Sequence, residues 1–288
     1  MTGKRSGDCK KGDITMEATI VFEPHIPDAL RRALDYAGDD GFVASLPQLL
    51  QARVSATYDN IIWNTWFTSY TEESVVTTAR GNRVVVVIHG GGIFASPERF
   101  ETAYRSKSHG LTGQFAARLT DREAREVLNG RLPDGSEFPI FAFDEFKRGV
   151  ADLPIRYGVI MDFELARKST RGYETFEALE EEPNMIVRAG GVEPLLAYLD
   201  KARNRHNTKV MGNWHPYNRI DPNENQTRVV FLAGNEGGLG TEDDDDHLYG
   251  YDAEYAIGGD ASIHNMARYV AVAPRNASTS VRYLPFEA

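Results

Sequence analysis

Runs of β-branched and other apolar residues along the chain are typical of strands. They predict strands over 17–22, 74–78, 83–88, 156–161, 184–188, 227–232 and 269–273. The consecutive valines of 84–87 leave no polar face, which indicates a central strand covered on both sides. Since 74–78 and 83–88 are joined by a short segment containing Gly81, we expect a β-hairpin there.

Apolar residues spaced three or four positions apart predict helices between these strands. Start and stop signals place them at 27–37, ended by Gly38; at 46–54, opened by Ser45; at 121–129, opened by the capping box Thr120–Glu123; and from Pro194 onward. The last helix follows the predicted strand 184–188, as in a strand-loop-helix unit. The predicted fold class is therefore α/β or α+β, a mixed sheet with a β-hairpin and strand-loop-helix units, and helices on both faces.

Composition adds the expected domain organisation. Residues 1–15 have few apolar side chains and predict a disordered tail, whereas residues 16–288 predict a single globular domain with a sizeable core. The apolar runs are too short to span a bilayer, and no signal peptide is recognisable, so we expect a cytoplasmic protein. The chain has one cysteine, Cys9, so neither an internal disulfide nor a thiolate metal cluster is expected.

Charge and histidine spacing limit the partners. A formal net charge of −10 disfavours nucleic acid, so we expect a small-molecule ligand and no membrane, and leave a homo-oligomer open. No pair of histidines has the helical spacing of metal ligands, and neither a metal nor a cofactor is predicted. The acidic run 241–247 has carboxylates suited to calcium but lacks the spaced pattern of a calcium loop, which favours a solvated acidic loop.

The segment 87–100 has the richest chemistry. A buried strand ends at His89, Gly90, Gly91 and Gly92 follow, and Ser96 precedes Pro97 as a helix start. Backbone N–H groups should converge here and bind an anion or a developing oxyanion. The alternative is a tight turn in which the glycines only let one chain segment pass close to another.

The sequence His89-Gly90-Gly91-Gly92 resembles the oxyanion-hole loop of the hormone-sensitive-lipase-type esterases, in the α/β-hydrolase family. That family also has a Gly-x-Ser-x-Gly nucleophile elbow on a later strand-to-helix turn, and this chain contains none. The nearest match, residues 106–110, follows a predicted helix. The triad of the family therefore has no counterpart here, and the esterase hypothesis fails.

Two further segments are candidates for ligand contacts. Arg188 precedes Gly190 and Gly191 and can clamp a carboxylate or phosphate, unless it pairs with a glutamate of 180–182. The segment 211–219, which includes Trp214 and His215, mixes aromatic and hydrogen-bonding side chains as ligand pockets do, or forms an ordered loop packed by its own side chains.

Two functions follow from these residues. The first is an enzyme, hydrolase-like or lyase-like, that acts on a small polar or anionic molecule by acid/base chemistry, with His89, His215 and Asp162 as catalytic residues and the glycine loop as cradle. The second is a non-catalytic ligand-binding or assembly protein. Separation of His89 from Asp162 and His215 in space would favour the second function.

Overall fold

The computed structural model describes most of the chain with its side chains. The described residues are 14–106, 108, 116–169, 172–206, 210–214, 217, 223–232, 249–252 and 267–276. Most of the predicted tail 1–15, the acidic run 241–247 and His215 lie outside them. The described part of the tail corrects its boundary, because Ile14 and Thr15 already belong to the first strand.

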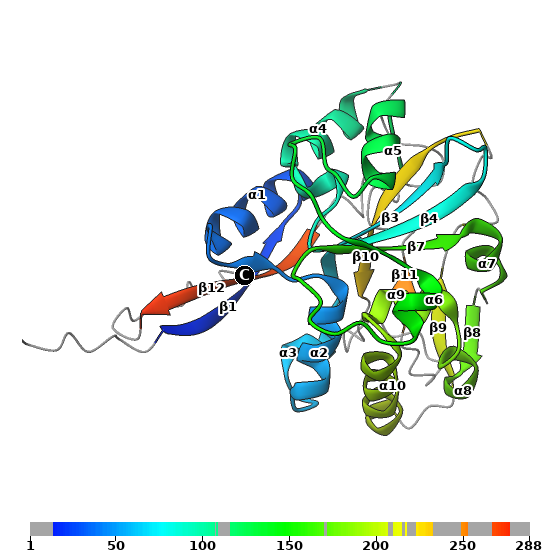
Figure 1. Cartoon of the computed structure of the whole chain (residues 1–288). Coiled ribbons are helices and arrows are strands. Elements are labelled where there is room, and N and C mark those ends of the chain that lie inside the picture. Colours follow the sequence, from blue (N-terminus) through cyan, green and yellow to red (C-terminus); the bar gives the residue numbers. More distant parts are fainter. Residues whose placement is uncertain are drawn as a thin grey trace, which may run out of the picture.

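A mixed six-stranded sheet forms the centre of the molecule (Figure 1). Its order is β5-β10-β3-β4-β7-β6, and all neighbours are antiparallel except the parallel pair β6 and β7. The strands are β3 (Phe67–Thr77), β4 (Arg83–His89), β5 (Ala117–Arg118), β6 (Ile140–Ala142), β7 (Tyr157–Asp162) and β10 (Gln226–Leu232). The predicted hairpin is confirmed, since β3 and β4 pair from Thr71↔His89 to Thr77↔Arg83.

Both faces of this sheet are covered, as the run of valines predicts. Val85 and Val87 belong to a core shared with α2 (Leu46–Ser55), α9 (Pro183–Ala189) and α10 (Val192–His206). Val86 and Ile88 belong to a second core that includes Ala124 and Val127 of α5 (Asp121–Leu128). Because successive side chains of a strand point to opposite faces, β4 has no polar face to expose.

Two smaller sheets flank the centre. One has the order β1-β12-β2, from β1 (Ile14–Glu23), β12 (Ala267–Asn276) and β2 (Phe42–Val43), and packs on α1 (Ile26–Ala37). The other has the order β11-β9-β8, from β11 (Tyr249–Asp252), β9 (Val210–Trp214) and β8 (Gly172–Thr175). The remaining helices are α3 (Ile61–Asn64), η1 (Ile93–Ala95, a 3-10 turn), α4 (Pro97–Arg105), α6 (Phe143–Lys147), α7 (Phe163–Lys168) and α8 (Phe176–Leu179).

Local signals fixed the helix starts correctly. Both α2 and α5 begin with a capping box, at Ser45 with Gln48 and at Thr120 with Glu123. The helix α1 has Pro27 in its first turn and ends at Gly38, whose N–H donates to the Leu34 carbonyl at 2.9 Å. These features satisfy backbone groups that a helix end leaves without partners.

The predicted strand 184–188 is wrong, because these residues form α9. Pro183 lies in the first turn and Gly190 ends the helix in the left-handed region, at φ 87°. A short apolar run buried on all sides has the same pattern in a helix as in a strand. The predicted strand-loop-helix unit is therefore a pair of consecutive helices, α9 and α10.

Candidate functional site

The loop after β4 has the backbone conformation that its glycines predict. Gly90 and Gly91 have φ angles of 80° and 94°, which glycine adopts without steric cost. Both donate their N–H groups to the carbonyl of Tyr70 on β3, at 3.0 and 2.9 Å. A Cβ atom on Gly91 would lie 2.5 Å from the Tyr70 ring, so the close approach of β3 requires glycine.

The next N–H groups of this loop converge on a carboxyl group of the same chain. Gly92 and Phe94 donate to Oε1 of Glu72 at 2.9 and 2.8 Å. Thr227 on β10 places its hydroxyl oxygen 3.4 Å from Oε2 of Glu72. The N–H groups that were predicted to bind an anion are thus engaged by an internal acidic side chain.

Glu72 has an unusual protonation equilibrium for a carboxyl group. Burial raises its pKa from 4.5 to about 7, although the N–H groups of Phe94, Gly92 and Ile93 favour the charged form. A Cβ atom on Gly92 would lie 2.7 Å from Oε2 of Glu72. The third glycine of the loop is therefore required by the approach of Glu72 rather than by a positive φ angle.

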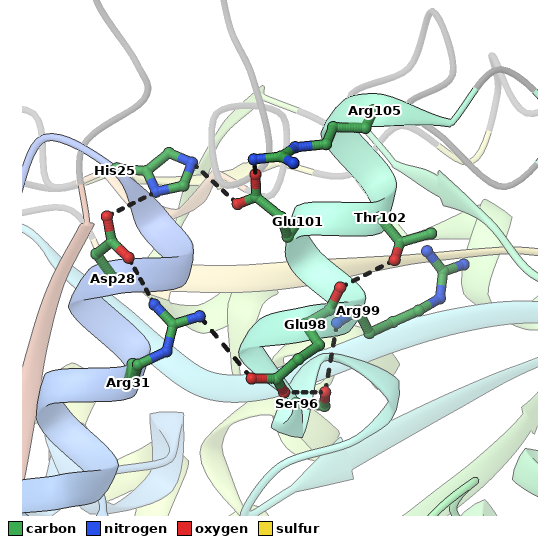
Figure 2. A network of polar contacts seen from close by, with 9 residues as sticks. All are labelled: His25, Asp28, Arg31, Ser96, Glu98, Arg99, Glu101, Thr102 and Arg105. Atoms are coloured by element: carbon green, nitrogen blue, oxygen red, sulfur yellow. Dashed lines mark hydrogen bonds and ion pairs between the residues drawn. The ribbon is translucent and has the colours of Figure 1, made fainter.

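Ser96 is used as a helix cap, and the start of α4 joins a surface network (Figure 2). The Oγ of Ser96 accepts the N–H of Arg99 at 3.3 Å and donates to Glu98 at 2.8 Å. Figure 2 shows the network continuing to α1, where His25 lies between Asp28 and Glu101, at 3.0 and 3.5 Å. A shallow hollow beside it is lined by Glu101, Thr102, Arg105 and Ser106, and each of these side chains has a hydrogen-bond or ion-pair partner within the protein.

His89 is fully buried, and both of its ring nitrogens are bonded within the protein. Nε2 lies 3.0 Å from the Val187 carbonyl, and Nδ1 lies 3.0 Å from Oγ1 of Thr71. A carbonyl can only accept, so Nε2 carries the proton and Nδ1 accepts from the Thr71 hydroxyl, whose oxygen accepts the Leu46 N–H at 2.9 Å. Burial lowers the pKa of His89 from 6.5 to about 4, which makes the ring neutral at pH 7.

Arg188 is fully buried in an ion pair with Glu73 of β3. Its Nε donates to Oε1 of Glu73, its Nη2 donates to Oε2 at 3.0 Å, and its Nη1 donates to Oδ1 of Asn213 at 3.3 Å. The hydroxyl of Tyr217 also donates to Oε2 of Glu73, at 2.8 Å. Burial opposes the charge of Glu73, but Arg188, Arg228 and the Tyr217 hydroxyl together keep the pKa of Glu73 below its usual value. We call these four side chains, Glu73, Arg188, Asn213 and Tyr217, the buried network.

The structure separates Asp162 from the other candidates. Along the ladder of β4 and β7, Asp162 pairs with Val84 and His89 pairs with Tyr157. Five residues at about 3.3 Å each place the two candidates about 17 Å apart. Asp162 caps α7, and its Oδ1 accepts the N–H groups of Glu164 and Leu165.

Gly190 and Gly191 terminate α9. The N–H of Gly190 donates to the Val187 carbonyl and that of Gly191 donates to the Ile186 carbonyl, the pattern of a Schellman motif. Trp214 is the last residue of β9 and follows Asn213 of the buried network, while His215 lies outside the described residues. The structure thus brings together His89, Arg188 and the residue before Trp214, but not Asp162.

Sequence reasoning missed Glu72 and Glu73, and it included Asn213 and Tyr217 only as members of the candidate segment 211–219, without identifying their partners. Arg188 pairs with Glu73 rather than with a glutamate of 180–182. The available signal was two adjacent carboxyl groups just before the run 74–78, beside a strand predicted to be central. Adjacent acidic residues inside a buried strand need partners on both faces, and the glycine loop and Arg188 are those partners.

Two classes of site are not found in the described part of the chain. No group of three or more His, Cys, Asp or Glu side chains there could hold a metal ion. Among the helices described, none is both long enough and apolar enough to cross a membrane.

Comparison with known proteins identifies the fold. No family model matches the sequence, and no curated protein matches it. One solved structure, described as "Accommodation of massive sequence variation in Nanoarchaeota by the C-type lectin fold", is similar with a TM-score of 0.61. The similarity covers 89% of this chain and 97% of that chain, at 22% sequence identity.

The fold is that of the C-type lectins. This α+β fold agrees with the predicted mixed sheet and its helices, and at this identity the similarity concerns the fold alone.

Proposed function

We propose that this C-type lectin-fold protein is a non-catalytic binding protein for a small polar or anionic molecule. The observation that carries the proposal is the state of His89, which is 0% exposed and bonded through both ring nitrogens. A general acid or base must reach a proton of the substrate. His89 has neither the access nor a free nitrogen, and Asp162 lies at the opposite end of the sheet.

The buried network supports a binding role for the segment 211–219. Asn213 and Tyr217 bond to the ion pair of Arg188 and Glu73, which lies between α9 and β3. Trp214 lies between these two anchors in the sequence, and its backbone pairs with Asp252 of β11. Preorganised residues lose less entropy when a ligand binds. We therefore assign the ligand contact to Trp214, with the buried network as its support.

The description of the similar solved structure is the second support for this proposal. Its description concerns a lectin fold that accommodates massive sequence variation. In the present chain, we propose that the buried network and the bonds of Glu72 form a fixed framework, and that residues outside it can differ without loss of the fold.

A combined binding and turnover screen tests the proposal. The wild-type protein is screened against a library of small polar metabolites and oligosaccharides by thermal shift, and each hit is followed by NMR for product formation. We expect binding without product. Trp214→Ala should weaken the binding of a hit by more than about tenfold, which corresponds to about 1.4 kcal/mol, whereas His89→Gln should retain it. Trp66→Ala serves as the matched control, because Trp66 is a partly buried tryptophan of another region.

Three outcomes would contradict the proposal. Formation of product that is abolished in His89→Gln would restore the acid/base enzyme. Equal loss of binding in Trp214→Ala and Trp66→Ala would place the ligand elsewhere. Absence of any hit in the library would contradict the assignment to small polar or anionic ligands.

A further inference from the structure

The surface network between α1 and α4 contains one histidine, His25, which lies between two carboxylates (Figure 2). Nδ1 of His25 lies 3.0 Å from Oδ2 of Asp28 in the first turn of α1. Nε2 lies 3.5 Å from Oε2 of Glu101 on α4. The two ring nitrogens therefore face carboxylates of two different helices. We call His25, Asp28 and Glu101 the latch.

A neutral histidine ring cannot satisfy both sides of the latch. Neutral imidazole has one N–H donor, and its other nitrogen carries a lone pair and accepts. In either tautomer, one bare nitrogen would face a carboxylate oxygen, at 3.0 Å or at 3.5 Å. The imidazolium has an N–H on both nitrogens and a positive charge, so it is the form that attracts Asp28 and Glu101 together.

The charged groups around His25 come from both helices. They are Asp28 and Arg31 of α1, and Glu98, Glu101 and Arg105 of α4. In this described set, three carboxylates meet two guanidinium groups, and a positive charge on His25 balances the third carboxylate. The ring of Tyr104 also lies beside His25, with 5.8 Å between ring centroids. Burial raises the pKa of Tyr104 above its usual value, so this ring stays neutral and adds no charge.

The carboxylate side of the latch stays charged in the range where a histidine titrates. The hydrogen bond with His25 is the main cause that lowers the pKa of Asp28 below its usual value. Histidine is the side chain whose ordinary charge change falls between about pH 5 and pH 8. The pH dependence of the latch in this range therefore comes from its histidine.

We propose that His25 is a proton-operated latch between α1 and α4, closed when its ring is an imidazolium and released when the ring loses its proton. The stability that the latch contributes is present at low pH and is lost as the pH rises and His25 releases its proton. The helix α4 follows the glycine loop and η1, so the latch acts on the segment whose start is bonded to Glu72. Beneath the latch, apolar residues of α1 and α4 share one core, so release loosens the contact between the helices without removing their packing.

A double-mutant cycle of His25→Gln and Glu101→Gln, measured by urea unfolding of the full chain, tests the proposal. Glutamine is neutral at every pH used. At pH 5.5 we expect a favourable coupling that changes the unfolding equilibrium constant by about two- to fivefold, the range of exposed ion pairs. At pH 8 the coupling should vanish or reverse its sign. Glu72 and His89 are present in all four proteins, so their own pH dependence cancels.

Arg105 provides the matched control, because it pairs with the same carboxylate of Glu101 and keeps its charge at both pH values. A cycle of Arg105→Gln and Glu101→Gln should give the same coupling at pH 5.5 and at pH 8. A change in this control as large as that of the histidine cycle would overturn the proposal, because it would assign the pH dependence to Glu101 rather than to His25.

Native-state hydrogen exchange gives a second readout, on α4 itself. Relative to intrinsic rates, His25→Gln should accelerate exchange of the α4 amides by about two- to fivefold at pH 5.5 and leave it unchanged at pH 8. A His25–Glu101 coupling that is equal at both pH values, or absent at pH 5.5, would overturn the proposal, as would α4 amides that do not respond to His25→Gln at pH 5.5. Ligand binding by Trp214 is measured separately, so a failure here leaves that proposal unaffected.

Discussion

Glu72→Gln isolates the energetic effect of a carboxyl group held by the glycine loop. The pKa of Glu72 is about 7 in the folded protein, against 4.5 for an unperturbed glutamate. The folded state therefore keeps a proton that the unfolded state releases between these values. The stability contributed by this group is fully present below pH 4.5 and is lost as the pH rises through 7.

The size of this effect follows from the two pKa values. A difference of about 2.5 units at 1.36 kcal/mol per unit gives about 3 kcal/mol. Glutamine is neutral throughout, and its carbonyl oxygen can accept the N–H groups of Gly92 and Phe94. We expect the unfolding free energy of Glu72→Gln, minus that of wild type, to rise by about 3 kcal/mol between pH 4.5 and pH 8.

His89 is present in both wild type and Glu72→Gln, and its contribution to stability has the opposite pH dependence to that of Glu72. Its pKa falls from 6.5 to about 4 on folding, so its contribution is fully present above pH 6.5 and is lost as the pH falls towards 4. In wild type the two groups partly cancel between pH 4.5 and 6.5. The variant should therefore lose stability on acidification more steeply than wild type does.

Urea unfolding at several pH values measures both curves. The exposed Glu137→Gln is the matched control, because Glu137 is 71% exposed beside Arg131. Its difference from wild type should stay flat. A Glu72→Gln difference that does not vary with pH would refute the reasoning, because it would mean that Glu72 is ionised throughout this range.

Two smaller predictions concern the loop and the surface. Gly92→Ala should lower the unfolding free energy by about 1 to 3 kcal/mol, because a Cβ atom would lie 2.7 Å from Glu72 Oε2 and displace the hydrogen bonds of Glu72. Thermal melts check this prediction. An unchanged melting temperature would show that the loop can shift to accommodate the methyl group. Arg31→Ala should change stability by less than about 1 kcal/mol, because its ion pair with Asp28 is solvent-exposed, and a larger loss in urea unfolding would contradict this.

The features predicted from sequence are those set by neighbouring residues. The hairpin of β3 and β4, the capping boxes of α2 and α5, and the positive φ angles of Gly90 and Gly91 depend on residues a few positions apart. The helix α9 differs from the predicted strand because its six consecutive buried residues, 184–189, give no period that separates a helix from a strand. Pro183 and Gly190 were the local signals for a helix.

The buried contacts could not be predicted, because their partners are distant in sequence. Arg188 and Glu73 are 115 positions apart, and His89 and Val187 are 98 positions apart. A glycine-rich strand-to-helix loop indicates that N–H groups converge, but it does not distinguish an external anion from an internal carboxyl group. That distinction depends on Glu72, whose position opposite the loop is set by the register of β3 with β4.

Glu72 and Glu73 are adjacent residues of β3, and their side chains bond to partners on opposite faces of the central sheet. Because adjacent residues of a strand point to opposite faces, Glu72 reaches Gly92 and Phe94, whereas Glu73 reaches Arg188. A buried ion pair gives little net stability, but breaking it leaves an uncompensated charge at a cost of about 3 to 5 kcal/mol. The two glutamates should therefore control two separate parts of the structure.

Native-state hydrogen exchange can separate these two parts. Glu72→Leu removes the acceptors of Gly92 and Phe94, at about 1 to 3 kcal/mol, so their amides should exchange about tenfold to a hundredfold faster. Arg188→Met should instead accelerate amides of β9 around Asn213, which loses the donor to its Oδ1. Glu72→Leu should accelerate exchange of the Gly92 and Phe94 amides more than that of the β9 amides, and Arg188→Met should do the reverse. Equal acceleration of both sets in both variants would mean that opening is global, and that the two glutamates stabilise one cooperative unit.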